Sequence, residues 1–221
     1  MGGTLVAIEQ DAALSEQLAV PRLWGWAVIA ILAILAGASG LVARGFTESG
    51  WRLGSELIWR FTCFAYFAAV IAGPLARLIP WQRLRDVCEN RRQLIWGFCA
   101  SFALYLAGMV IPNFFVFPDR GGWMTGIGTF DLFGGGLTVI IAGAASRRAA
   151  LFMGRRACGV VLGVSLSCFW LSYALAGLEH LSGPHRPDAF YGFSLLLMIA
   201  ALLLRFADQF AAKIRAGHNP A

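Results

Sequence analysis

Histidine is the residue type in this sequence with the clearest chemical potential, because imidazole ligates metals and carries protons near neutral pH. The three histidines are His180, His185 and His218. His180 and His185 stand at the end of a long apolar segment, and His218 is close to the end of the sequence. His180 is a candidate iron ligand that, with Met109 at the end of another apolar segment, could supply the His/Met ligation of some haem proteins. The alternative is that His180 and His185 are polar residues at a membrane surface.

A few charged residues fall inside apolar segments. Glu56 and Arg60 are four residues apart, so they can form an ion pair on one helix face. Asp131 precedes the triplet Gly134 to Gly136, which leaves nearly one helical turn without side chains. Such a turn admits either a closely packed helix or a flat ligand, and we expect close packing. For Asp131 we expect a packing or capping role, with an outer water-filled cavity as the functional alternative.

The other reactive residue types form no recognisable catalytic pattern. The serines have no histidine at motif spacing, the carboxylates are not paired, and neither GxGxxG nor a P-loop is present. Most of the five cysteines fall inside apolar segments, which favours small buried residues over disulfides or a zinc site: they are Cys63, Cys88, Cys99, Cys158 and Cys168. No catalytic residue is predicted, and electron transfer would need another protein or a lipid-soluble carrier.

The composition places these residues in a membrane. The chain has 221 residues, of which 58% are hydrophobic and 14% are charged, against roughly 25% charged in soluble proteins. This polar content is too small to cover a soluble domain. The net charge of +6 comes mainly from arginines that lie in short clusters between apolar segments, which is typical of membrane topology signals and argues against nucleic acid as a partner.

Six segments are long and apolar enough to cross a hydrocarbon layer of about 30 Å. They run from Leu23 to Ala43, from about Leu53 to Ile79, from Gln93 to Ile111, from about Gly126 to Ala145, from Ala157 to Leu181, and from Ala189 to Ala207. The sequence therefore predicts an all-α, six-transmembrane-helix bundle over residues 23–207, with tails at 1–22 and 208–221. Pro112 is expected to stop the third helix, and Gly37 and Gly40 are expected to allow close helix contact.

The basic residues predict the orientation of this bundle. Alternate connections and ends hold 13 of the 18 Lys and Arg residues, including the pairs Arg91–Arg92 and Arg155–Arg156. Because cytoplasmic loops are enriched in Lys and Arg, both termini are predicted to be cytoplasmic. These two pairs are expected to set the topology and to face cytoplasmic partners. Tryptophans in two clusters, Trp24 with Trp26 and Trp51 with Trp59, are expected to anchor the membrane interfaces.

Three stretches of the sequence resemble a known family. They are Ala72-Gly73-Pro74-Leu75-Ala76-Arg77-Leu78, Asn90-Arg91-Arg92-Gln93-Leu94 and Gly154-Arg155-Arg156. These stretches are similar to the ferric reductase-like transmembrane family, whose bacterial members include the haem-bearing membrane partner of the periplasmic methionine sulfoxide reductase. The resemblance covers most of the chain. It implies a six-helix core in the inner (cytoplasmic) membrane of a bacterium and electron transfer through haem b.

The resemblance also indicates where haem ligands would stand. In the family these are histidines on the third and fifth helices, and the corresponding positions here hold Tyr105, Cys158, and Leu171 or Ser172. Tyr105 as a phenolate and Cys158 as a thiolate are types that ligate haem iron.

Two classes of function follow from the sequence. The first, which the resemblance favours and which is the function we expect, is a membrane oxidoreductase component that binds haem, a quinone or a flavin and transfers electrons with a separate redox partner. The alternative is a cofactor-free structural or accessory subunit of the same fold, which binds lipid or a partner helix. The sequence leaves the oligomeric state open.

Overall fold

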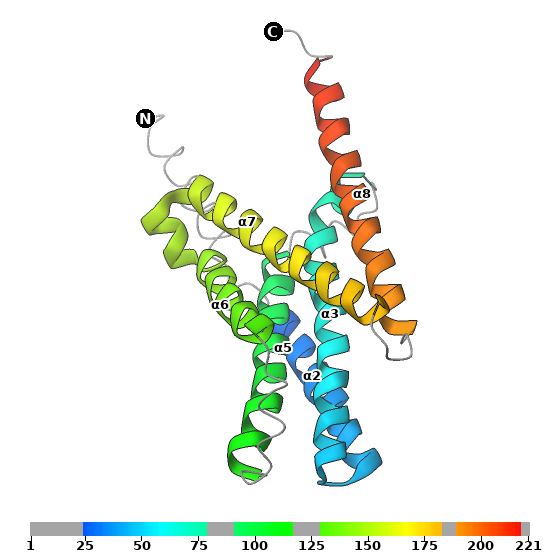
Figure 1. Ribbon diagram of the computed structural model, residues 1–221. Helices are drawn as coiled ribbons and strands as arrows, with labels where there is room; N and C mark the ends of the chain where they lie inside the picture. Colours follow the sequence, from blue (N-terminus) through cyan, green and yellow to red (C-terminus); the bar gives the residue numbers. More distant parts are fainter. Residues whose placement is uncertain (1–23, 79–90, 117–128, 183–188, 218–221) are drawn as a thin grey trace.

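The computed structural model describes residues 24–78, 91–116, 129–182 and 189–217, and every element in these ranges is a helix (Figure 1). The α-helices are α2 (Trp24–Arg44), α3 (Glu48–Leu78), α5 (Arg91–Ile111), α6 (Thr129–Ala144), α7 (Arg147–Ser182) and α8 (Ala189–Gly217), and a π-helical turn η1 (Pro112–Val116) follows α5. The predicted all-α class is confirmed. His185, His218 and Cys88 lie outside the described residues.

Among the described residues, five helices are long and apolar enough to cross a membrane, and the count reaches six if one bent pair is a single span. This pair corresponds to the predicted fourth span. Its helix α6 has 16 residues, about 24 Å at 1.5 Å per residue, which is shorter than the hydrocarbon layer. It is long enough to cross the membrane only together with the helical segment Arg148–Gly154, to which it is bent by 80°. The architecture is thus a bundle of five or six apolar helices.

The third predicted helix ends at Ile111 as expected, and Pro112–Val116 then form a π-helical turn. Other helix ends differ from the prediction. Helix α3 begins at Glu48 instead of near Leu53. Helix α8 continues past Ala207 to Gly217, so the predicted tail at 208–221 begins as a continuation of this helix. Helix α7 begins at Arg147 and has a break at Gly154, where φ is 79°. Glycine tolerates this left-handed φ, which redirects the chain into the predicted fifth span.

Close packing of α2, α3 and α5 depends on residues without side chains. A Cβ atom built at Gly40 would collide with the backbone of Gly54, and one built at Gly54 would lie 2.7 Å from the Gly37 carbonyl oxygen. A Cβ atom built at Gly97 of α5 would collide with the side chain of Ile29 in α2. The predicted role of Gly37 and Gly40 in helix contact is confirmed. Glycine at these crossings lets the backbones approach and gain van der Waals contact.

Charged side chains lie at the two ends of the bundle. On α3, Glu48, Arg52, Glu56 and Arg60 recur every fourth residue, and the next charged residue is Arg77. The interval from Arg60 to Arg77 is about 26 Å of helix, close to the thickness of the hydrocarbon layer. Helix α8 similarly has no charged residue before Arg205. We call the part of the bundle between the levels of Arg60 and Arg77 the charge-free layer.

Contacts between helices place their ends relative to this layer. The start of α2 meets the start of α5, because the Gly25 amide donates to the Gln93 side-chain oxygen (3.0 Å). The end of α3 meets α8 through an ion pair of 2.7 Å between Arg77 and Asp208. Arg91 at the start of α5 also donates to the Ala69 carbonyl in the later part of α3. The same end of the bundle therefore holds the beginnings of α2 and α5, the end of α3 and the part of α8 around Asp208. In Figure 1, α7 crosses the bundle obliquely, and α8 extends past the end of α3.

The glycine triplet of α6 gives a test of this packing. A Cβ atom at Gly134 would lie 2.8 Å from the ring of Phe102, which is fully buried, whereas a Cβ atom at Gly136 would meet nothing within 4 Å. We predict that Gly134→Leu lowers the free energy of unfolding by about 1–3 kcal/mol through overpacking. The matched variant Gly136→Leu is expected to leave it nearly unchanged. Thermal unfolding of both variants in detergent measures the difference, and equal stabilities would contradict this packing.

Candidate functional site

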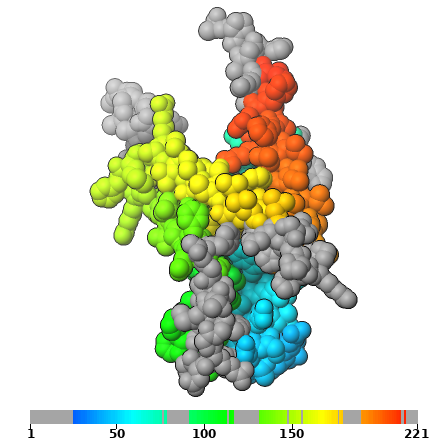
Figure 2. Space-filling view, viewed as in Figure 1, coloured from blue at the N-terminus to red at the C-terminus, as the bar shows by residue number. Residues whose placement is uncertain are grey.

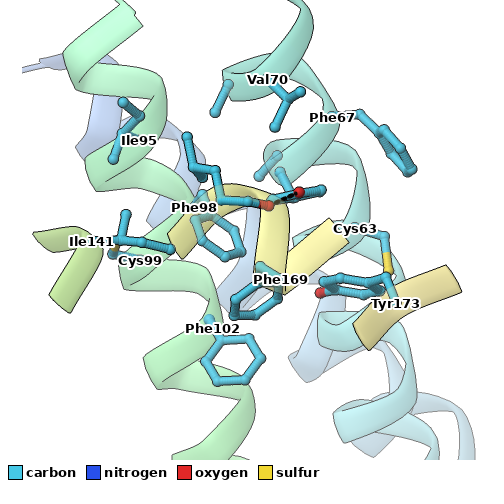
Figure 3. Packing of buried hydrophobic residues seen from close by; sticks show 14 of the residues in the cluster. Cys63, Phe67, Val70, Ile95, Phe98, Cys99, Phe102, Ile141, Phe169 and Tyr173 are labelled. Carbon is cyan, nitrogen blue, oxygen red and sulfur yellow. Dashed lines mark hydrogen bonds between the residues drawn. The ribbon is translucent and has the colours of Figure 1, made fainter. Parts of the chain in front are cut away.

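Aromatic residues recur at helical spacing on three helices and meet at the centre of the bundle. They are Trp59 and Tyr66 on α3, Phe98, Phe102 and Tyr105 on α5, and Phe169 and Tyr173 on α7. Residues three, four or seven positions apart share one face of a helix, so each helix turns an aromatic face inward. We call these seven residues the aromatic cluster. Figure 3 shows Phe169 of α7 between Phe98 and Phe102 of α5, and Tyr173 of α7 near Cys63 of α3.

The rings of the aromatic cluster are in direct contact. Tyr173 stacks on Trp59 and on Tyr66, with ring centroids 4.6 Å and 5.5 Å apart. Phe169 meets Phe98 and Phe102 edge to face, at 5.0 Å and 5.2 Å. Both arrangements are favoured by the aromatic quadrupole. The centre of the bundle is therefore filled by rings from α3, α5 and α7.

A hydroxyl–carboxylate pair borders the aromatic cluster. The hydroxyl of Tyr105 donates a hydrogen bond of 3.0 Å to Oδ1 of Asp131, and Asp131 is buried. The ring of Tyr105 packs on Trp59 at 5.0 Å. The predicted packing role of Asp131 fits this bond, which ties α6 to α5 at the level of Trp59.

The predicted ion pair completes this level of the bundle. Arg60 donates to Glu56 one turn away, which confirms the pairing expected from their spacing. The guanidinium of Arg60 also lies 5.0 Å from the ring centroid of Phe190 in α8, a distance typical of cation–π attraction. Glu56, Arg60, Tyr105 and Asp131 therefore form a polar border at one edge of the charge-free layer.

The residues that the resemblance indicates as ligands are not brought together around one iron. Tyr105 lies at the level of Tyr173, since both rings contact Trp59. Cys158 is also buried, but it precedes Tyr173 by 15 residues on α7, which separates the two by about 22 Å along the helix. Axial ligands of one haem lie on opposite sides of the same iron, so Tyr105 and Cys158 do not fit this role together. Leu171 is exposed and Ser172 is half-buried.

The pair proposed from residue type, Met109 and His180, lies on α5 and α7. Met109 is half-buried one turn beyond Tyr105, and His180 follows Tyr173 by two turns. Both positions are on the polar-border side of the aromatic cluster. The side chain of His180 lies outside the described residues, so this pairing stays a prediction. Within the described ranges, no group of three or more His, Cys, Asp or Glu residues is placed to hold a metal ion.

The arginine pairs differ in their surroundings. Arg91 is half-buried, and its Nε donates to the Ala69 carbonyl of α3 at 3.1 Å. This contact ties the start of α5 to α3. Arg92 is also half-buried, and Arg156 is exposed on α7, while the Arg155 side chain lies outside the described part.

Two features of the site are not predicted from the sequence. Trp59 is predicted to anchor a membrane interface, but in the structure it packs in the aromatic cluster. The aromatic spacing on α3, α5 and α7 is the signal that could have identified the cluster. The bond from Tyr66 to the Leu166 carbonyl, 2.6 Å long, had no such signal because the two residues are 100 positions apart.

Comparison with known proteins adds no relative to this picture: no family model matches the chain, and no curated protein or solved structure is significantly similar to it.

The Tyr105–Asp131 bond can be measured by a double-mutant cycle. We predict that Tyr105→Phe and Asp131→Leu, which removes the acceptor, are coupled by about 1 kcal/mol in the free energy of unfolding, the usual net value of one hydrogen bond. Tyr66→Phe is the matched control, because the hydroxyl of Tyr66 donates to a backbone carbonyl instead. It is expected to be additive with Asp131→Leu. Additivity of Tyr105→Phe with Asp131→Leu would mean that the bond contributes nothing to stability.

Proposed function

We propose that the chain is a structural or accessory subunit of a membrane complex and that its bundle works without a cofactor. The observation that carries the proposal is the aromatic cluster, whose rings fill the space between α3, α5 and α7. Tyr66, Phe98, Phe102 and Phe169 are each no more than 1% exposed. Tightly packed interiors have no room for a large planar group without rearrangement.

The outward faces of the helices support the same proposal. Large apolar side chains are exposed along α2, α7 and α8, among them Leu35, Phe152, Val160, Leu196 and Leu203. Exposed apolar faces of this kind contact lipid or the helices of other membrane proteins. We infer that the bundle crosses the inner membrane of a bacterium six times, with the ends of α3 and α8 in the cytoplasm, as the arginine distribution favours.

A second candidate is the electron-transfer component expected from the resemblance to ferric reductase-like proteins. One observation favours it: Trp59, Tyr66, Tyr105 and Tyr173 are in contact from ring to ring, and a carboxylate accepts the hydrogen bond of Tyr105. In this alternative, haem b or a quinone binds at the edge of the bundle, near Met109 and His180, and a separate redox protein is the partner.

The visible spectrum of the purified protein separates the two proposals. The full chain is expressed with added haem precursor, purified in mild detergent and examined before and after dithionite. The accessory proposal predicts no Soret band and no haem in a pyridine haemochrome assay. A Soret band, with an α band that sharpens on reduction, would overturn it in favour of electron transfer.

If haem is found, single replacements locate the iron. His180→Ala, Met109→Leu and Tyr105→Phe test the candidate ligands, and Tyr66→Phe is the control for loss of a buried hydroxyl. Loss of the haem band with His180→Ala or Met109→Leu would place iron at the polar border. An unchanged spectrum in all three variants would reject these residues as ligands.

A further inference from the structure

A shallow, open groove runs along one face of α7 and is bordered by α8. Gly159, Gly163 and Ser167 line it from α7, and Arg205 lines it from α8. The three α7 residues recur every fourth position and so share one helix face. Nothing lies within 4 Å of a Cβ atom built at Gly159 or Gly163, so this face is not filled by the chain itself. Figure 2 shows the surface hollowed between α7 and the upper part of α8.

The rest of the groove is apolar, with Val160, Val164 and Leu171 along the same helix. A smaller cavity of about 90 Å³ adjoins it, since Ser167 and Arg205 line both. In a membrane, an apolar groove of this kind is complementary to an acyl chain. An acyl chain alone would not account for the arginine side chain that lines this groove.

Arg205 is the charged residue of the groove. One of its terminal nitrogens lies 3.4 Å from the hydroxyl of Ser167, and among the described residues it has no carboxylate partner. Nearby, Arg91 lies at the same end of the bundle, where its Nε donates to the Ala69 carbonyl. Arg77, also at this end, is paired with Asp208. The end of the bundle near Arg205 therefore carries an excess of positive charge, which attracts an anion.

We propose that this groove binds an anionic phospholipid, with the lipid phosphate at Arg205 and an acyl chain along Gly159 and Gly163. The guanidinium donates hydrogen bonds to phosphate oxygens. The hydroxyl of Ser167 donates to the Gly163 carbonyl at 2.8 Å and accepts from Arg205, so it positions the guanidinium at the groove. The open glycine face accepts the chain without displacing any side chain. Basic pockets between membrane helices hold lipid headgroups by this combination of charge and apolar contact.

Native mass spectrometry of the full chain in detergent tests the proposal. The protein is titrated with dioleoyl phosphatidylglycerol, with dioleoyl phosphatidylcholine and with inorganic phosphate. We expect phosphatidylglycerol to bind about fivefold or more tightly than phosphatidylcholine, the contribution of one arginine near a membrane surface. Arg205→Gln should remove this preference. Arg52→Gln, which removes an exposed arginine from the opposite end of the bundle, should retain it.

A second pair of variants tests the acyl-chain part of the groove. Gly163→Leu fills the open face and is expected to weaken both lipids, whereas Gly136→Leu, also in open space on α6, should not. Equal affinity of the wild type for both lipids would overturn the proposal, as would a preference that survives Arg205→Gln. Binding of free phosphate at Arg205, with phosphatidylglycerol affinity unaffected by Gly163→Leu, would replace the lipid by a phosphate site.

Discussion

The exclusion of charge from a layer about as thick as a lipid hydrocarbon core is the constraint on which the rest of this structure depends. Along α3 it separates the polar face that ends at Arg60 from Arg77, and along α8 it ends at Arg205. Within the layer, helices satisfy the backbone internally, and side chains contribute packing and a few hydrogen bonds. Glycine at Gly40, Gly54 and Gly97 brings α2, α3 and α5 together. The polar groups that remain are gathered at the two edges.

The two edges differ in chemistry. One edge joins aromatic rings to a hydrogen-bonded carboxylate and an ion pair, and its charges are largely matched by neighbours of the chain itself. The opposite edge holds Arg77, Arg91 and Arg205 with one described carboxylate, Asp208. The first edge stabilises the junction of α3, α5, α6 and α7. The second edge presents uncompensated positive charge beside an open groove, and it is the place where we propose that a lipid binds. The accessory role is instead inferred from the filled centre of the bundle.

Much of the fold follows from composition and local spacing. The apolar runs of α2, α3, α5, α7 and α8 locate five helices, and the spacing of Glu56 and Arg60 predicts their ion pair. Local sequence patterns do not predict which helices far apart in the chain contact one another. The break at Gly154, the short α6 and the position of Trp59 in the aromatic cluster depend on packing between helices far apart in the chain. The positions that the resemblance indicates as ligands likewise depend on packing, and Tyr105 and Cys158 do not meet in the bundle.

The side of the membrane on which each edge lies is the most direct test of this account. Single cysteines are introduced at Arg91, Arg155 and Arg52 in a variant without the five native cysteines and labelled with an impermeant maleimide in sealed, oriented vesicles. The account predicts that positions 91 and 155 react from the cytoplasmic side and position 52 from the opposite side. Labelling of positions 91 and 155 from opposite sides would contradict the arrangement of the helices around one charge-free layer.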